Sequence, residues 1–117
     1  MDYEYSVIGS ISCSKDALAK EKESSEFTFK SYTFLLRKFN KQISARLCNS
    51  TDCQNISEED VKEVCKQLSI KFVCPVSMRK GYEVYGNANV FNGGSDYEII
   101  EEKWFKVEFD NGIQKLI

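Results

Sequence analysis

Residues 57–76, SEEDVKEVCKQLSIKFVCPV, give the clearest local signal of the chain. Ser57 suits the N-cap of a helix, because its hydroxyl can accept a hydrogen bond from a first-turn amide. Acidic side chains follow at 58–60, where they favour the positive end of the helix dipole. Apolar side chains then recur at the spacing of an amphipathic helix, at Val61, Val64, Cys65 and Leu68. We therefore expect a well-defined α-helix over residues 57–68.

The periodicity changes after Leu68. From Ile70 to Val76, apolar residues occupy every second position, which predicts a strand that follows the helix almost directly. Pro75 has no backbone N–H, so we expect it at the end of that strand or on a sheet edge. The whole stretch predicts the scaffold against which the other strands pack.

Most of the remaining chain reads as strands. Alternation of apolar and polar residues predicts a first strand over 3–13 and a long strand over 97–109. Between residues 27 and 38 the apolar phase shifts. Either a bulge near Lys30 or Ser31 restores a single apolar face, or one end of the strand is covered on both sides.

Short polar sequences are expected to connect these strands. Asp110-Asn111-Gly112 predicts a hairpin back into residues 113–117, because Asn and Gly tolerate the backbone angles of a tight turn. Residues 49–55 read as a polar loop before the Ser57 cap. Further turns are expected at Asn40-Lys41, Lys80-Gly81 and 92–95, with short strand segments at 82–85 and 88–91 interrupted at Gly86-Asn87.

These elements predict an α+β fold in a single domain over residues 1–117. We expect a mainly antiparallel, curved β-sheet with the 57–68 helix packed on one face. Residues 14–23 form either a second short helix on that face or a polar loop. Two arrangements remain open: a split βαβ unit of the ferredoxin-like type, or a sheet curved around the 57–68 helix.

Composition and charge disfavour several classes of function. The chain has 117 residues, 42% of them hydrophobic, and a net charge of −2. A nucleic-acid partner is disfavoured, because neutralising phosphates normally requires a clear basic excess. No apolar run approaches the roughly 18 residues of a membrane span, so no membrane partner is expected. The N-terminus does not resemble a secretory signal and the cysteine count is odd, which favours the cytoplasm.

The chain offers few groups for catalysis. It contains no histidine, so the usual Cys–His and Ser–His arrangements are absent and we expect no enzyme. Of the five cysteines, Cys53 is the one placed near a helix N-terminus, where a thiolate is favoured. Cys48 and Cys53 flank the polar loop, but a reducing compartment disfavours a disulfide between them. Cys13, Cys65 and Cys74 read as small buried side chains, and neither metal nor cofactor is expected.

The distinctive surface feature is Trp104 on the long strand. By alternation it shares a face with Ile100 and several acidic residues, which is a frequent composition of a protein interface. The alternative is that a second layer, such as the N-terminal segment, covers the indole. The expected partner-binding residues are Trp104, Glu98, Glu101, Glu102, Glu108, Asp110 and Tyr85.

These features predict a non-enzymatic protein-binding domain that presents an acidic, aromatic-bearing surface to a basic partner. Small size and mild acidity suit an inhibitor or immunity-type protein that neutralises a toxin. One alternative is a small-ligand pocket between sheet and helix, lined by Phe and Tyr. The other is a nucleic-acid-binding domain that uses the basic residues Arg37, Lys38, Lys41 and Arg46 of one hairpin.

Overall fold

A computed structural model describes residues 3–87 and 97–116; the segments expected at 88–91 and 92–95 lie outside these ranges. In chain order the elements are β1 (Tyr3–Ile11), α1 (Lys15–Lys20), β2 (Ser24–Phe29), β3 (Tyr32–Phe39), β4 (Gln42–Leu47), α2 (Ser50–Asn55), α3 (Glu58–Phe72), β5 (Pro75–Asn87), β6 (Tyr97–Asp110) and β7 (Ile113–Lys115). The strands form a seven-stranded antiparallel sheet in the order β2-β3-β4-β1-β5-β6-β7. The predicted α+β class is confirmed.

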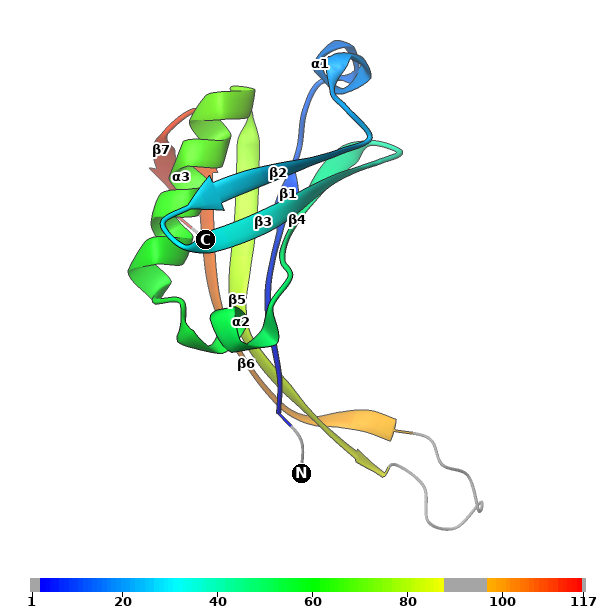
Figure 1. Ribbon diagram of the computed structural model, residues 1–117, viewed down its shortest axis with the longest axis vertical. Helices are drawn as coiled ribbons and strands as arrows, with labels where there is room; N and C mark the ends of the chain where they lie inside the picture. Colours follow the sequence, from blue (N-terminus) through cyan, green and yellow to red (C-terminus); the bar gives the residue numbers. More distant parts are fainter. Residues whose placement is uncertain (1–2, 88–96, 117) are drawn as a thin grey trace.

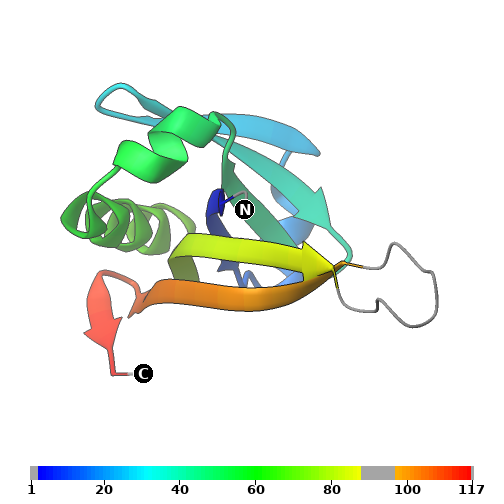
Figure 2. The same cartoon turned by 90° about the horizontal axis from the view of Figure 1, so that it is seen from below.

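The sheet is curved, and α2 and α3 lie on its concave side (Figures 1 and 2). The N-terminal strand β1 lies at the centre, where it pairs with β4 and β5. All pairings among the described strands are antiparallel, whereas a ferredoxin-like split βαβ unit needs a parallel pair. That alternative is therefore wrong, and the curved sheet around the helix is confirmed. No helix within residues 3–87 and 97–116 has the length and apolar content to cross a membrane.

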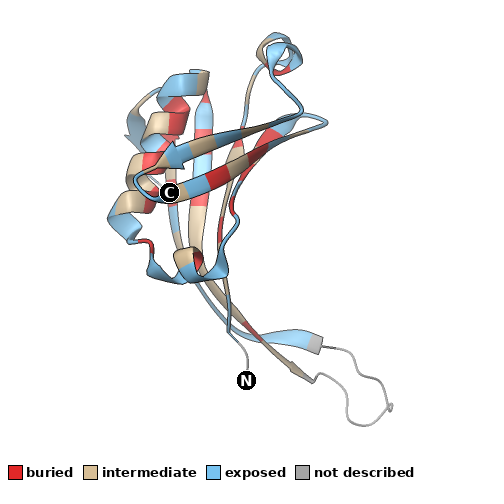
Figure 3. Ribbon diagram, in the orientation of Figure 1, coloured by how far each residue is buried: buried red, intermediate tan, exposed pale blue. Residues whose placement is uncertain are grey.

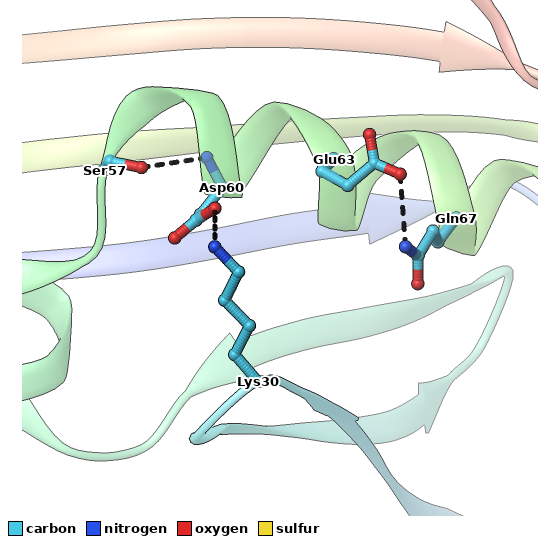
Figure 4. A network of polar contacts seen from close by, with 5 residues as sticks. All are labelled: Lys30, Ser57, Asp60, Glu63 and Gln67. Carbon is cyan, nitrogen blue, oxygen red and sulfur yellow. Dashed lines mark hydrogen bonds and ion pairs between the residues drawn. The ribbon is translucent and has the colours of Figure 1, made fainter.

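The helix α3 begins at the predicted cap and buries the predicted stripe. The Ser57 hydroxyl accepts a hydrogen bond from the Asp60 amide at 3.1 Å. The Asp60 carboxylate in turn binds Lys30 of the β2–β3 turn at 3.0 Å (Figure 4). The stripe residues are fully buried against the concave face of the sheet (Figure 3): Val61, Val64, Cys65 and Leu68.

The helix continues beyond residue 68, so the strand expected from Ile70 is wrong. α3 ends at Phe72, and Val73 then adopts a left-handed φ of 53° while its N–H binds the Ser69 carbonyl. Pro75 does lie at a strand end, because it is the first residue of β5. The apolar residues at 70, 72, 74 and 76 alternate like those of one strand, but the first two belong to the end of α3 and the last belongs to β5.

A buried serine fixes this longer helix end. The Ser69 hydroxyl donates to the Lys66 carbonyl at 2.7 Å and accepts from the Gly112 amide at 2.9 Å. It thereby joins the last turns of α3 to the β6–β7 turn, where Asn111 and Gly112 have positive φ as the Asp110-Asn111-Gly112 hairpin requires. That hairpin prediction is confirmed.

The phase shift between residues 27 and 38 comes from a tight turn. Lys30 and Ser31 connect β2 to β3, Lys30 has a φ of 54°, and Phe29 pairs with Tyr32. Because the chain reverses there, odd residues of β2 and even residues of β3 face the same core. The bulge and the doubly covered strand are both wrong, whereas the expected turn at Asn40-Lys41 is confirmed.

The expected polar loop over 49–55 is instead the short helix α2. The Asn49 side chain accepts from two amides of the first turn, at 2.9 and 3.3 Å, and so caps it. Cys53 and Ile56 are buried in the core, which anchors the helix. The Lys80 ammonium donates to the Ile56 carbonyl at the C-terminal end, where a cation is favoured.

Two other predictions concern β5 and the N-terminal region. β5 runs unbroken through Lys80-Gly81 and Gly86, so no turn or interruption occurs at these glycines. A Cβ at Gly81 would lie 1.9 Å from the Lys103 carbonyl oxygen, so this glycine serves a close backbone approach and not a turn. The short helix expected within 14–23 is confirmed as α1, which Ser14 caps.

Replacement of Ser69 by alanine should lower the free energy of unfolding by about 1–2 kcal/mol, because the Gly112 amide loses its acceptor. Ser12→Ala, which changes an exposed serine, is the matched control and should have little effect. Urea denaturation measures both. Equal stability of the two variants would contradict a stabilising contact between α3 and the β6–β7 turn.

Candidate functional site

α2 and α3 lie on the same side of the sheet (Figure 2), and the core is on that side. The opposite, convex side is called here the outer face. All three helices contribute buried side chains to the core on the concave side. Along each strand the core positions alternate with the outer ones. On β5, for example, Val76 and Met78 are buried in the core, so Ser77 and Arg79 point to the outer face.

Trp104 lies on this outer face and is partly buried. The Arg79 guanidinium carbon lies 4.3 Å from the centre of the indole, a cation–π contact. Gly81 is directly opposite Trp104, and a Cβ there would come within 2.7 Å of the indole Cε3. The missing side chain therefore lets the indole lie against β5. The N-terminal strand lies within the sheet and does not cover Trp104.

A row of carboxylates crosses the sheet on one side of Trp104. Glu4, Glu83 and Glu102 occupy directly opposed positions on β1, β5 and β6. Like charges at opposed positions destabilise a sheet. The Tyr85 hydroxyl donates to the Glu83 carboxylate, and this hydrogen bond raises the pKa of Tyr85. We call these three glutamates the acidic row.

A row of cations crosses the sheet on the other side of Trp104. Arg79 is directly opposite Lys106, and Arg46 belongs to the same row, separated from Arg79 by Ile8. Within residues 3–87 and 97–116, none of these three cations has a carboxylate oxygen within 4.0 Å; the ion pair of that region joins Lys30 and Asp60. We call Arg46, Arg79 and Lys106 the basic row.

The basic row borders a groove of about 470 Å³ on the outer face. Backbone atoms and side chains of four neighbouring strands line it, including Ile8, Ser10, Gln42, Ser44, Ser77 and Glu108. The Ser10 hydroxyl donates to the Gln42 side-chain oxygen at 2.7 Å, which leaves the Gln42 amide hydrogens free to point elsewhere. The groove therefore combines three cations, one carboxylate, hydroxyls and the aliphatic side chain of Ile8.

The structure brings together some of the predicted partner-binding residues. Trp104 and Glu102 share the outer face, and Tyr85 is linked to the same region through Glu83. Glu108 also lies on this face, at the groove beyond the basic row.

Other predicted residues lie apart from Trp104. Glu101 is on the concave face, where it accepts from the Tyr82 hydroxyl at 3.0 Å. Asp110 is at the far end of β6, next to the β6–β7 turn. Glu98 is exposed beyond a register shift in β6 that interrupts the strict alternation.

Sequence reasoning missed Arg79, Glu83 and Glu4. Arg79 and Glu83 point to the same face of β5, but the turn expected at Lys80-Gly81 placed them on different elements. The position of Glu4 opposite Glu83 depends on strand pairing that no local pattern encodes. Of the basic hairpin, Arg37 and Arg46 point to the outer face, while Lys38 alternates to the other side and Lys41 lies in the turn.

Three of the thiols, those of Cys53, Cys65 and Cys74, are buried and therefore poorly placed for nucleophilic chemistry. Burial raises the pKa of Cys53, the thiol considered as a nucleophile, and so disfavours its thiolate. Burial also raises the pKa of Cys65 and of Cys74 to about 12. All five cysteines are free thiols, although the Cys13 and Cys74 sulfurs lie 3.8 Å apart. In the described ranges no three Cys, Asp or Glu side chains converge as metal ligands, and this includes the acidic row.

Comparison of the chain with protein-family models, with curated protein sequences and with solved structures found no significant match. The geometry of the outer face is therefore the basis for assigning a function.

The raised pKa of Cys65 predicts loss of stability at alkaline pH. The unfolded thiol ionises near pH 9.0, whereas the folded thiol keeps its proton until about pH 12. The unfolded state binds fewer protons in that window, so the free energy of unfolding falls there by at most about 1.4 kcal/mol per pH unit. Urea denaturation of Cys65→Ser between pH 8 and 11 should show a shallower decline than the parent protein. Val64→Ala, which keeps the thiol, should retain the original slope.

The opposed glutamates predict a gain of stability on charge reversal. Glu102→Lys places a cation opposite Glu83 and should raise the free energy of unfolding by about 0.2–1 kcal/mol at low ionic strength. Added salt should reduce this gain. The matched control is Glu23→Lys, at an exposed residue between α1 and β2. A loss of stability in Glu102→Lys would mean that the acidic row does not repel itself.

Proposed function

We propose that this chain is a non-enzymatic protein-binding domain that engages its partner through the outer face. The observation that supports this most directly is the cation–π contact of Trp104 with Arg79 on the outer face of the sheet. Trp and Arg are among the residues that most often dominate the binding energy of interfaces. Because Gly81 and Arg79 already hold the indole, little side-chain entropy is lost when a partner covers it.

The acidic row specifies the partner's chemistry. Its three carboxylates repel one another in the free protein, and a basic group of a partner would relieve that repulsion. We therefore expect a partner with a basic patch next to an apolar or aromatic surface that covers Trp104. Among such partners, an inhibitor or immunity-type role against a toxin remains a prediction from chain size and charge.

The test begins with capture of partners from a native lysate of the source cells on immobilised parent protein and on variants. A partner of the outer face is recovered by the parent and by Glu23→Lys, and is lost from Trp104→Ala and Glu102→Lys. With the purified partner, Trp104→Ala should weaken binding about thirtyfold or more, the factor that corresponds to a loss of 2 kcal/mol. Binding by the parent should weaken as salt is added, and Glu102→Lys should show a smaller salt dependence.

Thermal denaturation of each variant checks that it is folded. Partners that bind Trp104→Ala and Glu102→Lys as tightly as the parent would contradict the proposal, as would failure to recover any partner. Since Glu102→Lys is expected to be more stable than the parent, loss of binding in that variant cannot be attributed to unfolding.

A further inference from the structure

We propose that the groove along the basic row is a binding site for a small molecule that carries a phosphate monoester. The site adjoins the protein-binding surface at Trp104 and shares Arg79 with it, but it does not depend on that function. It uses Arg46, Arg79 and Lys106 as the anion-binding groups.

The cations of the groove have no carboxylate partner among the described residues, although Arg79 also contacts the Trp104 indole. Arg79 and Lys106 are directly opposed on adjacent strands, a like-charge pair that destabilises the free protein. Neither they nor Arg46 lies within 4.0 Å of a carboxylate oxygen in the described residues. An anion bound between them would replace repulsion by attraction. This arrangement is costly as a structural feature and is typical of a site that awaits a negative charge.

The spacing of the cations suits one compact anion. Neighbouring strands lie about 4.8 Å apart, so Arg79 and Lys106 start from adjacent positions. The backbone of Arg46 lies about 10 Å from that of Arg79, two strand spacings away across β1, with Ile8 between them. Long guanidinium and ammonium side chains can span this distance and converge on a group above Ile8. Guanidinium groups bind phosphate oxygens in bidentate fashion, which a single ammonium cannot do.

The net charge of the groove favours a dianion. Three cations and the carboxylate of Glu108 leave a net charge of +2 along its walls. A phosphate monoester carries about −1.5 to −2 at pH 7, whereas a carboxylate or a phosphodiester carries only one negative charge. The Ser77 hydroxyl and the Gln42 amide supply further donors, whereas the Ser10 and Ser44 hydroxyls already donate to the Gln42 side-chain oxygen and the Arg37 carbonyl. A phosphate monoester therefore matches both the charge and the donors.

The size of the groove leaves room for the organic part of such a ligand. Its volume of about 470 Å³ lies within the range of about 300–1,000 Å³ that small-molecule sites occupy. Ile8 gives an aliphatic surface against which a ring or chain can pack. A single-stranded nucleic acid fits less well, because a long polyanion leaving the groove along the sheet would approach the acidic row. A compact ligand avoids that repulsion.

Phenyl phosphate is a suitable probe, because it combines a phosphate monoester with a small apolar ring. Titration of the full chain at pH 7.5, followed by amide NMR, should shift the resonances of Ser10, Ser44 and Ser77 at millimolar concentration or below. Arg46→Gln and Lys106→Gln should each weaken binding about tenfold or more, the effect of losing one charged hydrogen bond. Arg37→Gln is the matched control, since it removes one cation from the same face outside the groove, and should change the affinity less than twofold.

Comparison ligands separate a dianion site from general attraction to positive charge. Benzenesulfonate has the same ring but one negative charge, so it should bind several-fold more weakly than phenyl phosphate. Lowering the pH to 5 protonates phenyl phosphate, whose second pKa is about 6, and should reduce its advantage over benzenesulfonate. Absence of phenyl phosphate binding would overturn the proposal. Equal weakening by Arg37→Gln, or tighter binding of a short oligothymidylate in the same groove, would overturn it as well.

Discussion

The burial of one apolar stripe of α3 against the concave face of the sheet determines the arrangement of the other elements. Val61, Val64, Cys65 and Leu68 have no exposed surface, and they pack mainly on β5 and β6. Removing such side chains from water is the main favourable term in folding. Because strand residues alternate, packing helices on one face directs every second side chain of the sheet to the opposite face.

Two contacts hold this helix in register with the sheet. At its start, Asp60 joins the Ser57 cap to Lys30 of the β2–β3 turn (Figure 4). At its end, Ser69 binds the Gly112 amide of the β6–β7 turn. The helix is thereby tied to turns of the sheet at both ends. A fixed helix keeps β5 and β6 in place, and these strands supply Arg79, Trp104 and most of the charges of the outer face.

The outer face sorts charge by rows, with the acidic row and the basic row on either side of Trp104. A charged outer face suffices for a stable sheet, but opposed like charges weaken it. The free protein is therefore less stable than one with alternating charges would be. Such local conflicts with stability are expected where binding depends on them. The two proposed sites share this origin and have opposite signs, so the face is electrostatically bipolar.

Local signals in the sequence determined much of the fold: the Ser57 cap, the apolar stripe of α3, the long strand and the Asp110-Asn111-Gly112 turn. Each depends on contacts within a few residues, or on a periodicity that one element shows alone. Predictions were wrong where a distant partner decides the backbone. The end of α3 is held by the hydrogen bond between Ser69 and the β6–β7 turn. Position 81 must be glycine because a side chain there would clash with the Lys103 carbonyl of the neighbouring strand.

The candidate site was also predictable from the sequence only in part. Alternation alone placed Trp104 on one face of its strand with Glu102 and Glu108. Only the tertiary structure decided that Arg79 lies against the indole, because the two residues belong to different strands. It likewise decided which charges oppose one another, since the register of neighbouring strands is set by packing and turns across the whole sheet. The sequence by itself determined which residues form the elements, and the pairing of those elements created both charged rows.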